Sequence, residues 1–213
     1  MNITCMDTAQ SHVEGMTALF ANQGWDGALE HVVRPDLLAR AQSDGIDAVA
    51  QDVAVQRAHD QTDTKVVLAD CADANAVLCT CSTLGALVEE SGTGKAVRID
   101  RPAMEQAASY RNVMLAICLE STRAPTVALF EDCAKGREPV VVLCDGAWAH
   151  FEAGDMSGFN RAVAQSVGAA MIGAPDTACI VLAQASMQGA APYLMDMGVP
   201  VLTTPRLAVR RAI

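Results

Sequence analysis

The chain has 213 residues, of which 51% are hydrophobic, 19% charged and 4% aromatic, and its formal net charge is −10. Such an acidic balance argues against nucleic acid and anionic membrane surfaces, which both require a basic footprint. No apolar run approaches the roughly 20 residues that cross a bilayer, and residues 1–12 lack the basic start and apolar run of a secretion signal. The eight cysteines are therefore expected to be reduced thiols, and the sequence predicts a cytoplasmic protein.

In the first half of the chain, short apolar runs alternate with longer amphipathic stretches. The segment 65–72 suits a strand or a buried helix, because periodicity cannot distinguish the two. Ser11 is expected to cap the first helix. Strands are predicted at 2–7, 29–34, 75–80 and 95–99, and helices at 11–22, 35–61, 84–90 and 103–110.

The same alternation starts again near residue 112. A regular alternation of strands and helices along the chain predicts parallel strands with helices packed on the sheet faces. Strands are predicted at 112–118, 139–144, 177–183 and 199–203, and helices at 126–135, 147–152, 157–170, 184–197 and 206–213.

The predicted fold is therefore α/β, with two pseudo-symmetric lobes, each a parallel sheet flanked by helices. We expect an N-terminal lobe at 1–109 and a C-terminal lobe at 110–213, with a closing helix that can pack back on the first lobe. Because ligands bind at the carboxyl ends of parallel strands, the active site is expected in the cleft between the lobes.

Cys81 stands between an apolar strand and a predicted helix, in the sequence VLCTCSTLG at 77–85. A helix amino terminus is expected to lower the pKa of such a thiol, and the hydroxyls of Ser82 and Thr83 are suited to holding a carboxylate. This arrangement suits proton abstraction beside a carboxylate. An equally weighted interpretation makes Cys79 and Cys81 buried core residues with hydroxyl caps.

No other motif supplies a metal or nucleotide site. A zinc site needs four ligands at characteristic spacing, which no second cysteine or histidine pair supplies, so no metal is predicted. The histidines at 12, 31, 59 and 150 stand singly and are expected to be surface or capping residues.

Six segments carry a resemblance to a known family, and they occur in the family's order over nearly the whole chain. Together they resemble the aspartate/glutamate/hydantoin racemase superfamily, which also contains arylmalonate decarboxylase and maleate isomerase. The segments are CMDTAQS at 5–11, CST at 81–83, RIDRPAM at 98–104, STRAPT at 121–126, IVLAQASM at 180–187 and VPVLTTP at 199–205.

The resemblance implies a cofactor-independent enzyme in which Cys81 moves a proton at the α-carbon of a small carboxylate or amino acid. Two thiols on opposite faces of that carbon act as acid and base in this family. The resemblance also implies a homo-oligomer. It assigns substrate contacts to Asp7, Ser11, Ser82, Thr83, Thr122, Thr126, Gln184, Ala185 and Ser186.

The sequence departs from the family pattern at Ala185, which stands where the second catalytic cysteine is expected. Cys179, at the start of that strand, should point away, and Cys118 is either a replacement thiol or a core residue. A single-cysteine decarboxylase, a cis-trans isomerase of a dicarboxylate and a non-catalytic carboxylate-binding protein therefore remain alternatives. Because a residue at a strand end should contribute little to the core, Cys81→Ala is predicted to abolish activity with little loss of stability.

Overall fold

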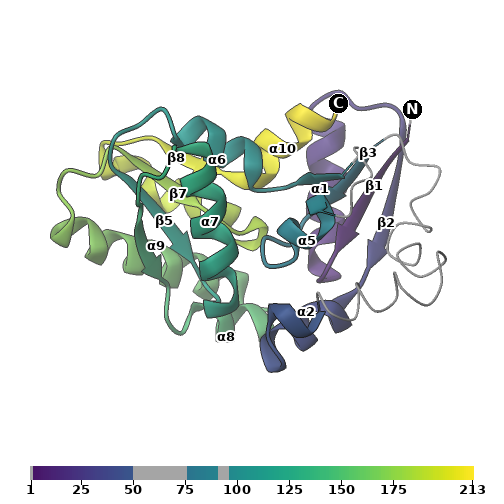
Figure 1. Ribbon diagram of the computed structural model, residues 1–213, viewed down its shortest axis with the longest axis horizontal. Helices are drawn as coiled ribbons and strands as arrows, with labels where there is room; N and C mark the ends of the chain where they lie inside the picture. The colour runs from purple at the N-terminus through teal and green to yellow at the C-terminus, as the bar shows by residue number, and fades with distance from the viewer. Residues whose placement is uncertain (1, 50–75, 91–95) are drawn as a thin grey trace. The chain divides into compact units, whose positions relative to one another are not determined.

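The computed structural model describes residues 2–49, 76–90 and 96–213 (Figure 1). The chain divides into two compact units, one reaching Ile99 and including Ala208–Ile213, the other formed by Asp100–Leu207. Each unit contains one four-stranded sheet, with strand orders β2-β1-β3-β4 and β6-β5-β7-β8. All the strand pairs in both sheets are parallel. The predicted α/β class, with two lobes built on parallel sheets, is confirmed.

The first unit places β1 and β3 at the centre of its sheet. Register brings Met6 opposite Cys79, so the carboxyl ends of β1 and β3 lie side by side. An apolar cluster of this unit includes Met6 and Cys79 from these strands, together with Leu84 and Val88. The elements of this unit are β1 (Asn2–Asp7), α1 (Ser11–Asn22), β2 (Ala28–Val33), α2 (Pro35–Ser43), β3 (Ala76–Cys79), α5 (Gly85–Glu90) and β4 (Ala96–Arg98).

The second unit repeats the strand order of the first. Every residue of its central strands β5 and β7 is buried, as expected for parallel strands covered on both faces. Its elements are α6 (Arg101–Ala107), β5 (Val113–Ile117), η1 (Glu120–Thr122), α7 (Arg123–Cys133), β6 (Val140–Leu143), α8 (Ala147–Glu152), α9 (Met156–Gly173), β7 (Cys179–Leu182), η2 (Ala185–Met197), β8 (Val201–Thr203) and the start of α10 (Thr204–Ala212).

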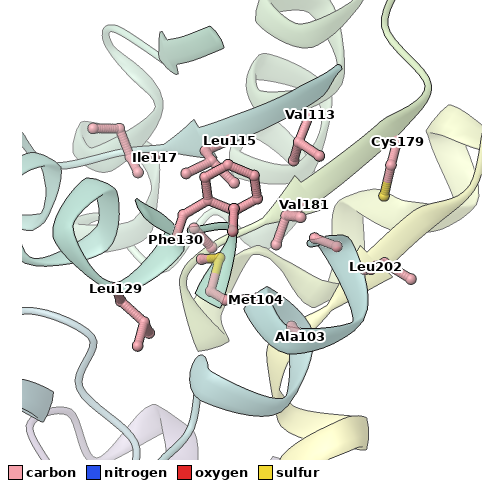
Figure 2. Close-up of a cluster of buried hydrophobic side chains, with 13 residues drawn as sticks. Ala103, Met104, Val113, Leu115, Ile117, Leu129, Phe130, Cys179, Val181 and Leu202 are labelled. Carbon is pink, nitrogen blue, oxygen red and sulfur yellow. The ribbon is translucent and has the colours of Figure 1, made fainter. Parts of the chain in front are cut away.

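Side chains of β5 alternate between two apolar clusters, one on each face of the second sheet. Leu115 packs on one face with Phe130 of α7 and Met104 of α6, as Figure 2 shows. Met114 packs on the other face with Phe159 of α9. This period of two is the geometry of a strand, and it explains why the apolar runs of the sequence are continuous rather than alternating.

The structure differs from the predicted elements in three respects. Helix α6 packs Ala103 and Met104 into the core of the second unit, whose first residue is Asp100, whereas the sequence suggested a boundary at 109. The segment Ala185–Met197 is a run of 3-10 turns that contains Pro192, and proline has no N–H for an α-helical hydrogen bond. Helix α1 begins at Ser11, but its cap position is Gln10 and no side chain caps it.

Some predictions fall on residues outside the described ranges. The predicted helix at 35–61 is observed as α2, which ends at Ser43, with a further helical turn at 46–49. Its remainder, the segment 65–72 and His59 lie outside the described residues. Within the residues that the structure does describe, no helix is long and apolar enough to span a membrane.

Candidate active site

The carboxyl ends of β1 and β3 bring together most of the predicted site residues of the first unit. Asp7 ends β1, and Thr80 follows β3 directly. The backbone N–H of Thr80 donates to the carbonyl oxygen of Met6 at 3.0 Å, extending the strand pairing by one residue. The next residue, Cys81, therefore lies at the edge of the sheet where parallel α/β folds place their functional groups.

Cys81 is a buried thiol surrounded by hydrogen-bond donors. Its side chain is 6% exposed and belongs to the apolar cluster of the first unit. Burial raises the pKa of the thiol, while four hydrogen bonds act in the opposite direction. These bonds come from the hydroxyls of Thr8 and Thr83 and from the backbone N–H groups of Thr83 and Leu84. The thiol shares the Leu84 N–H with the carbonyl oxygen of Cys81, which lies 3.2 Å from the Leu84 nitrogen.

The raised pKa of Cys81 corrects the lowered value expected from a helix amino terminus. Helix α5 has only six residues and begins at Gly85, four positions after the thiol. The field of a helix terminus falls off within about one turn, so apolar burial outweighs it. The N–H groups of Thr83 and Leu84, just before α5, and the hydroxyls of Thr8 and Thr83 lower the pKa, but by less than burial raises it.

Other predicted contacts of the first unit differ in exposure. Ser82 and Thr83 are buried in the turn after β3, beside the thiol. Ser11 is exposed at the start of α1. Thr8 was not predicted, although it lies within the recognised segment 5–11 and its hydroxyl bonds to the thiol.

Both carboxyl oxygens of the fully buried Asp7 are occupied within the first unit. Oδ1 accepts a hydrogen bond from Thr80 Oγ1 at 2.7 Å, and Oδ2 lies 2.7 Å from His31 Nδ1. His31 therefore differs from the expected surface or capping histidine. Its role is invisible in the sequence because it depends on the pairing of β1 with β2, 24 residues further along the chain.

In the second unit, Thr122 ends η1 and Thr126 lies in the first turns of α7, and both are fully buried. Within the described part of the chain, Thr126 Oγ1 has no hydrogen-bond partner. An unsatisfied buried hydroxyl is costly, and Ser121 Oγ and Thr204 Oγ1 share this state.

Gln184, Ala185 and Ser186 follow β7. Gln184 is buried, and its Oε1 accepts a hydrogen bond from the backbone N–H of Cys118 at the end of β5. Ala185 is 7% exposed at the start of η2, and Ser186 is half-buried. The Gln184 side chain thus ties together the ends of two strands within this unit.

Cys118, Cys144 and Cys179 of the second unit all lie at other positions of the second sheet than Ala185, which follows β7. Cys179 is fully buried at the amino end of β7, where burial raises its pKa to about 11. Cys118 and Cys144 follow β5 and β6, and their thiols are hydrogen-bonded to each other. This bond raises the pKa of Cys118 and lowers that of Cys144. Across the described ranges, no cluster of three or more His, Cys, Asp or Glu side chains has metal-site geometry.

No family model and no curated protein matches the sequence. Among solved structures, the chain is similar to glutamate racemase from Francisella tularensis subsp. tularensis SCHU S4 in complex with D-glutamate. The TM-score is 0.72, with 14% identity over 99% of this chain and 78% of that one.

Two further structures share the fold along the whole chain. Allantoin racemase from Pseudomonas fluorescens has a TM-score of 0.58 and 18% identity, over 100% of this chain and 89% of that one. A mutant of arylmalonate decarboxylase in a sulfate-associated form has a TM-score of 0.59 and 17% identity, over 100% of this chain and 91% of that one. The chain therefore has the fold of these two racemases and of the decarboxylase.

Proposed function

We propose that the chain is a cofactor-independent enzyme in which Cys81 transfers a proton at the α-carbon of a small carboxylate or amino acid. The observation that carries this proposal is the set of four donors around the Cys81 sulfur. A core cysteine needs no such donors, whereas a thiol that must pass through its anionic form does.

In the proposed step, the Cys81 thiolate removes the α-proton of the substrate. The electron pair of the C–H bond moves into the carboxylate, which becomes an enediolate. Return of the proton from the Cys81 thiol restores the C–H bond and the thiolate. Hydroxyl and N–H donors stabilise the enediolate charge, and Ser82, Thr122, Thr126 and Ser186 are the candidates that the resemblance supplies.

A second candidate is decarboxylation, favoured by the alanine at position 185 and by the raised pKa of Cys81. Loss of carbon dioxide from a malonate-type diacid leaves its electron pair on the α-carbon as an enediolate. A protonated thiol then donates its proton to that carbon, and the thiolate left behind takes a proton from water to complete the cycle, so no base is needed to start the reaction. One thiol is sufficient for this chemistry.

A panel of acids incubated with the enzyme in heavy water tests both candidates. The panel contains both enantiomers of glutamate and aspartate, allantoin and an arylmalonate, with deuterium incorporation and carbon dioxide release as readouts. We expect α-deuterium in at least one acid with the wild type and none with Cys81→Ser. Tight binding of an acid without exchange or carbon dioxide release would favour a carboxylate-binding protein instead.

A further inference from the structure

The buried Asp7 carboxyl connects three neighbouring strands of the first sheet. Asp7 itself ends β1, Thr80 follows β3 and His31 lies in β2. The carboxyl oxygens lie 2.7 Å from Thr80 Oγ1 and 2.7 Å from His31 Nδ1. The carbonyl oxygen of Met6, 3.2 Å from Thr80 Oγ1, is a second and more distant acceptor for the same hydroxyl proton. The Asp7 side chain thus links the end of β1 to the end of β3 and to β2.

These two strand ends carry the thiol and one of its donors. Thr8 follows Asp7 directly, and Cys81 follows Thr80 directly. The Thr8 hydroxyl bonds to the Cys81 thiol and lowers its pKa against the effect of burial. A shift of either strand end would therefore change the distance between this hydroxyl and the sulfur.

His31 is the support for the Asp7 oxygen on the β2 side. In the parallel register, His31 lies opposite Cys5, two residues before Asp7. Its side chain is 12% exposed, and its Nε2 lies 3.0 Å from Thr17 Oγ1 of α1. Without the Nδ1–H group, a buried carboxyl oxygen would lose its donor, which is unfavourable enough to turn the carboxyl.

We propose that His31 is a positioning residue for Cys81. By holding the Asp7 carboxyl against Thr80, it keeps the Thr8 hydroxyl in contact with the thiol. The inference rests on the proposed role of Cys81, and it gives Asp7 a structural task in place of the substrate contact that the resemblance implies.

Two other titratable groups lie beside this network. His12 of α1 is close enough to Asp7 to interact electrostatically, and burial lowers its pKa while the charge of Asp7 opposes that shift. The Cys79 thiol donates to the carbonyl oxygen of Cys81 at 3.5 Å. Both groups are kept unchanged in the variants that follow.

Two amide substitutions of His31 separate its two ring nitrogens. His31→Asn places an amide near the position of Nδ1 and can keep the bond to Asp7. His31→Gln places the amide near Nε2, so the bond to Asp7 is lost. The readout is the pH midpoint of Cys81 alkylation by iodoacetamide, followed by mass spectrometry, because access affects the plateau rate but not the midpoint.

We expect His31→Gln to move the Cys81 midpoint up by about 0.5 to 1 pH unit, because the thiolate loses the Thr8 hydroxyl. His31→Asn should restore the wild-type midpoint. The midpoint of Cys133, a half-buried thiol of the second unit, should be the same in all three proteins. An unchanged Cys81 midpoint in His31→Gln, or an equal shift in His31→Asn, would overturn the proposal.

If His31→Gln does not fold, Thr80→Val and Thr80→Ser test the same network from the other strand. Thr80→Val removes the donor to Asp7 and should raise the Cys81 midpoint, whereas Thr80→Ser keeps the donor and the midpoint. Equal midpoints in this pair would contradict the proposal. Failure of the proposed function is a different result, namely α-deuterium exchange that survives Cys81→Ser.

Discussion

Cys81 combines two opposing influences on one side chain. Apolar neighbours such as Met6 and Leu84 disfavour the thiolate, whereas Thr8, Thr83 and the local N–H groups favour it. Because burial is the larger influence and raises the pKa, the unliganded thiol keeps its proton at neutral pH. Such a thiol can donate a proton at once, and it becomes a base only when a bound substrate changes its surroundings.

The burial of Cys81 corrects the expectation that its loss leaves stability unchanged. The side chain is 6% exposed within an apolar cluster, so Cys81→Ala should lower the free energy of unfolding by about 1 kcal/mol through a small cavity. Urea denaturation measures this change, with Cys81→Ser as the control that keeps most of the volume. Both variants should lose activity, and a fully active Cys81→Ala would contradict the assignment.

A thiol at position 185 should supply the second acid/base group that the racemase pattern contains. Ala185 is 7% exposed at the start of η2, and we expect Ala185→Cys to raise the ratio of racemisation to α-deuterium exchange several-fold above wild type. Ser186→Cys moves the same thiol by one residue and serves as the control. Racemisation is measured by chiral chromatography. If Ala185→Cys and Ser186→Cys have the same ratio of racemisation to exchange, position 185 is not the place of the second acid/base group.

At the scale of elements, Gly85 allows α5 to begin against the buried side chain of Arg98. A Cβ at Gly85 would lie 2.7 Å from Arg98 Nε and 3.1 Å from its Cγ. Because Arg98 is 3% exposed, it has little room to move, and Gly85→Ala should lower the free energy of unfolding by about 1 to 3 kcal/mol.

Gly173 supplies the matched control for that substitution. It ends α9, and a Cβ added there would meet no atom within 4 Å among the described residues, apart from its chain neighbours and the backbone of its own helix. Gly173→Ala should be neutral or stabilising, because alanine is the better helix former. Equal effects of the two substitutions in urea denaturation would show that the contact with Arg98 does not restrict position 85.

The start of α9 should have a stability that depends on pH. Asp155 caps this helix by accepting from the backbone N–H of Gly158 at 2.8 Å, and it lies 2.9 Å from His150 Nδ1. The Gly158 bond, followed by the His150 bond, holds the pKa of the carboxyl below 3.8. A lowered folded-state pKa contributes stability above the unfolded value of 3.8, and this contribution is lost as pH falls through the lowered value.

Asp155→Ala should therefore be less stable than wild type at pH 5, and the difference should shrink below pH 4. Asp155→Asn keeps an acceptor without a charge, so it should be more stable than Asp155→Ala by an amount that does not change with pH, and its difference from wild type should also shrink below pH 4. Thermal unfolding followed by circular dichroism at several pH values measures both. A difference for Asp155→Ala that persists unchanged at pH 3 would show that the ionised carboxyl is not responsible.

The elements were predictable where local signals agree. Buried parallel strands such as β5 and β7 produce continuous apolar runs, and α8 begins and ends where its pattern predicts. Contacts set by strand order were not predictable, which is why the His31 and Thr80 bonds to Asp7 were missed. The sequence predicts a helix where η2 forms 3-10 turns, because α-helices and 3-10 turns both place apolar residues three positions apart.

At the scale of the whole molecule, the net charge of −10 disfavours the approach of a carboxylate. Under the proposed function, binding of a carboxylate would therefore depend on local hydroxyl and N–H donors, such as those around Cys81. The two units share one strand order, which agrees with the two pseudo-symmetric lobes that the repeated sequence pattern predicts. The homo-oligomer and the cytoplasmic location stay predictions.

The central claim is that Cys81 acts alone as the acid/base group of this chain. The most direct test follows α-deuterium incorporation and optical purity together, in one reaction of an accepted chiral acid in heavy water. We predict deuterium incorporation that is much faster than racemisation in the wild type and no incorporation in Cys81→Ala. Racemisation as fast as incorporation, or incorporation that survives in Cys81→Ala, would contradict the claim.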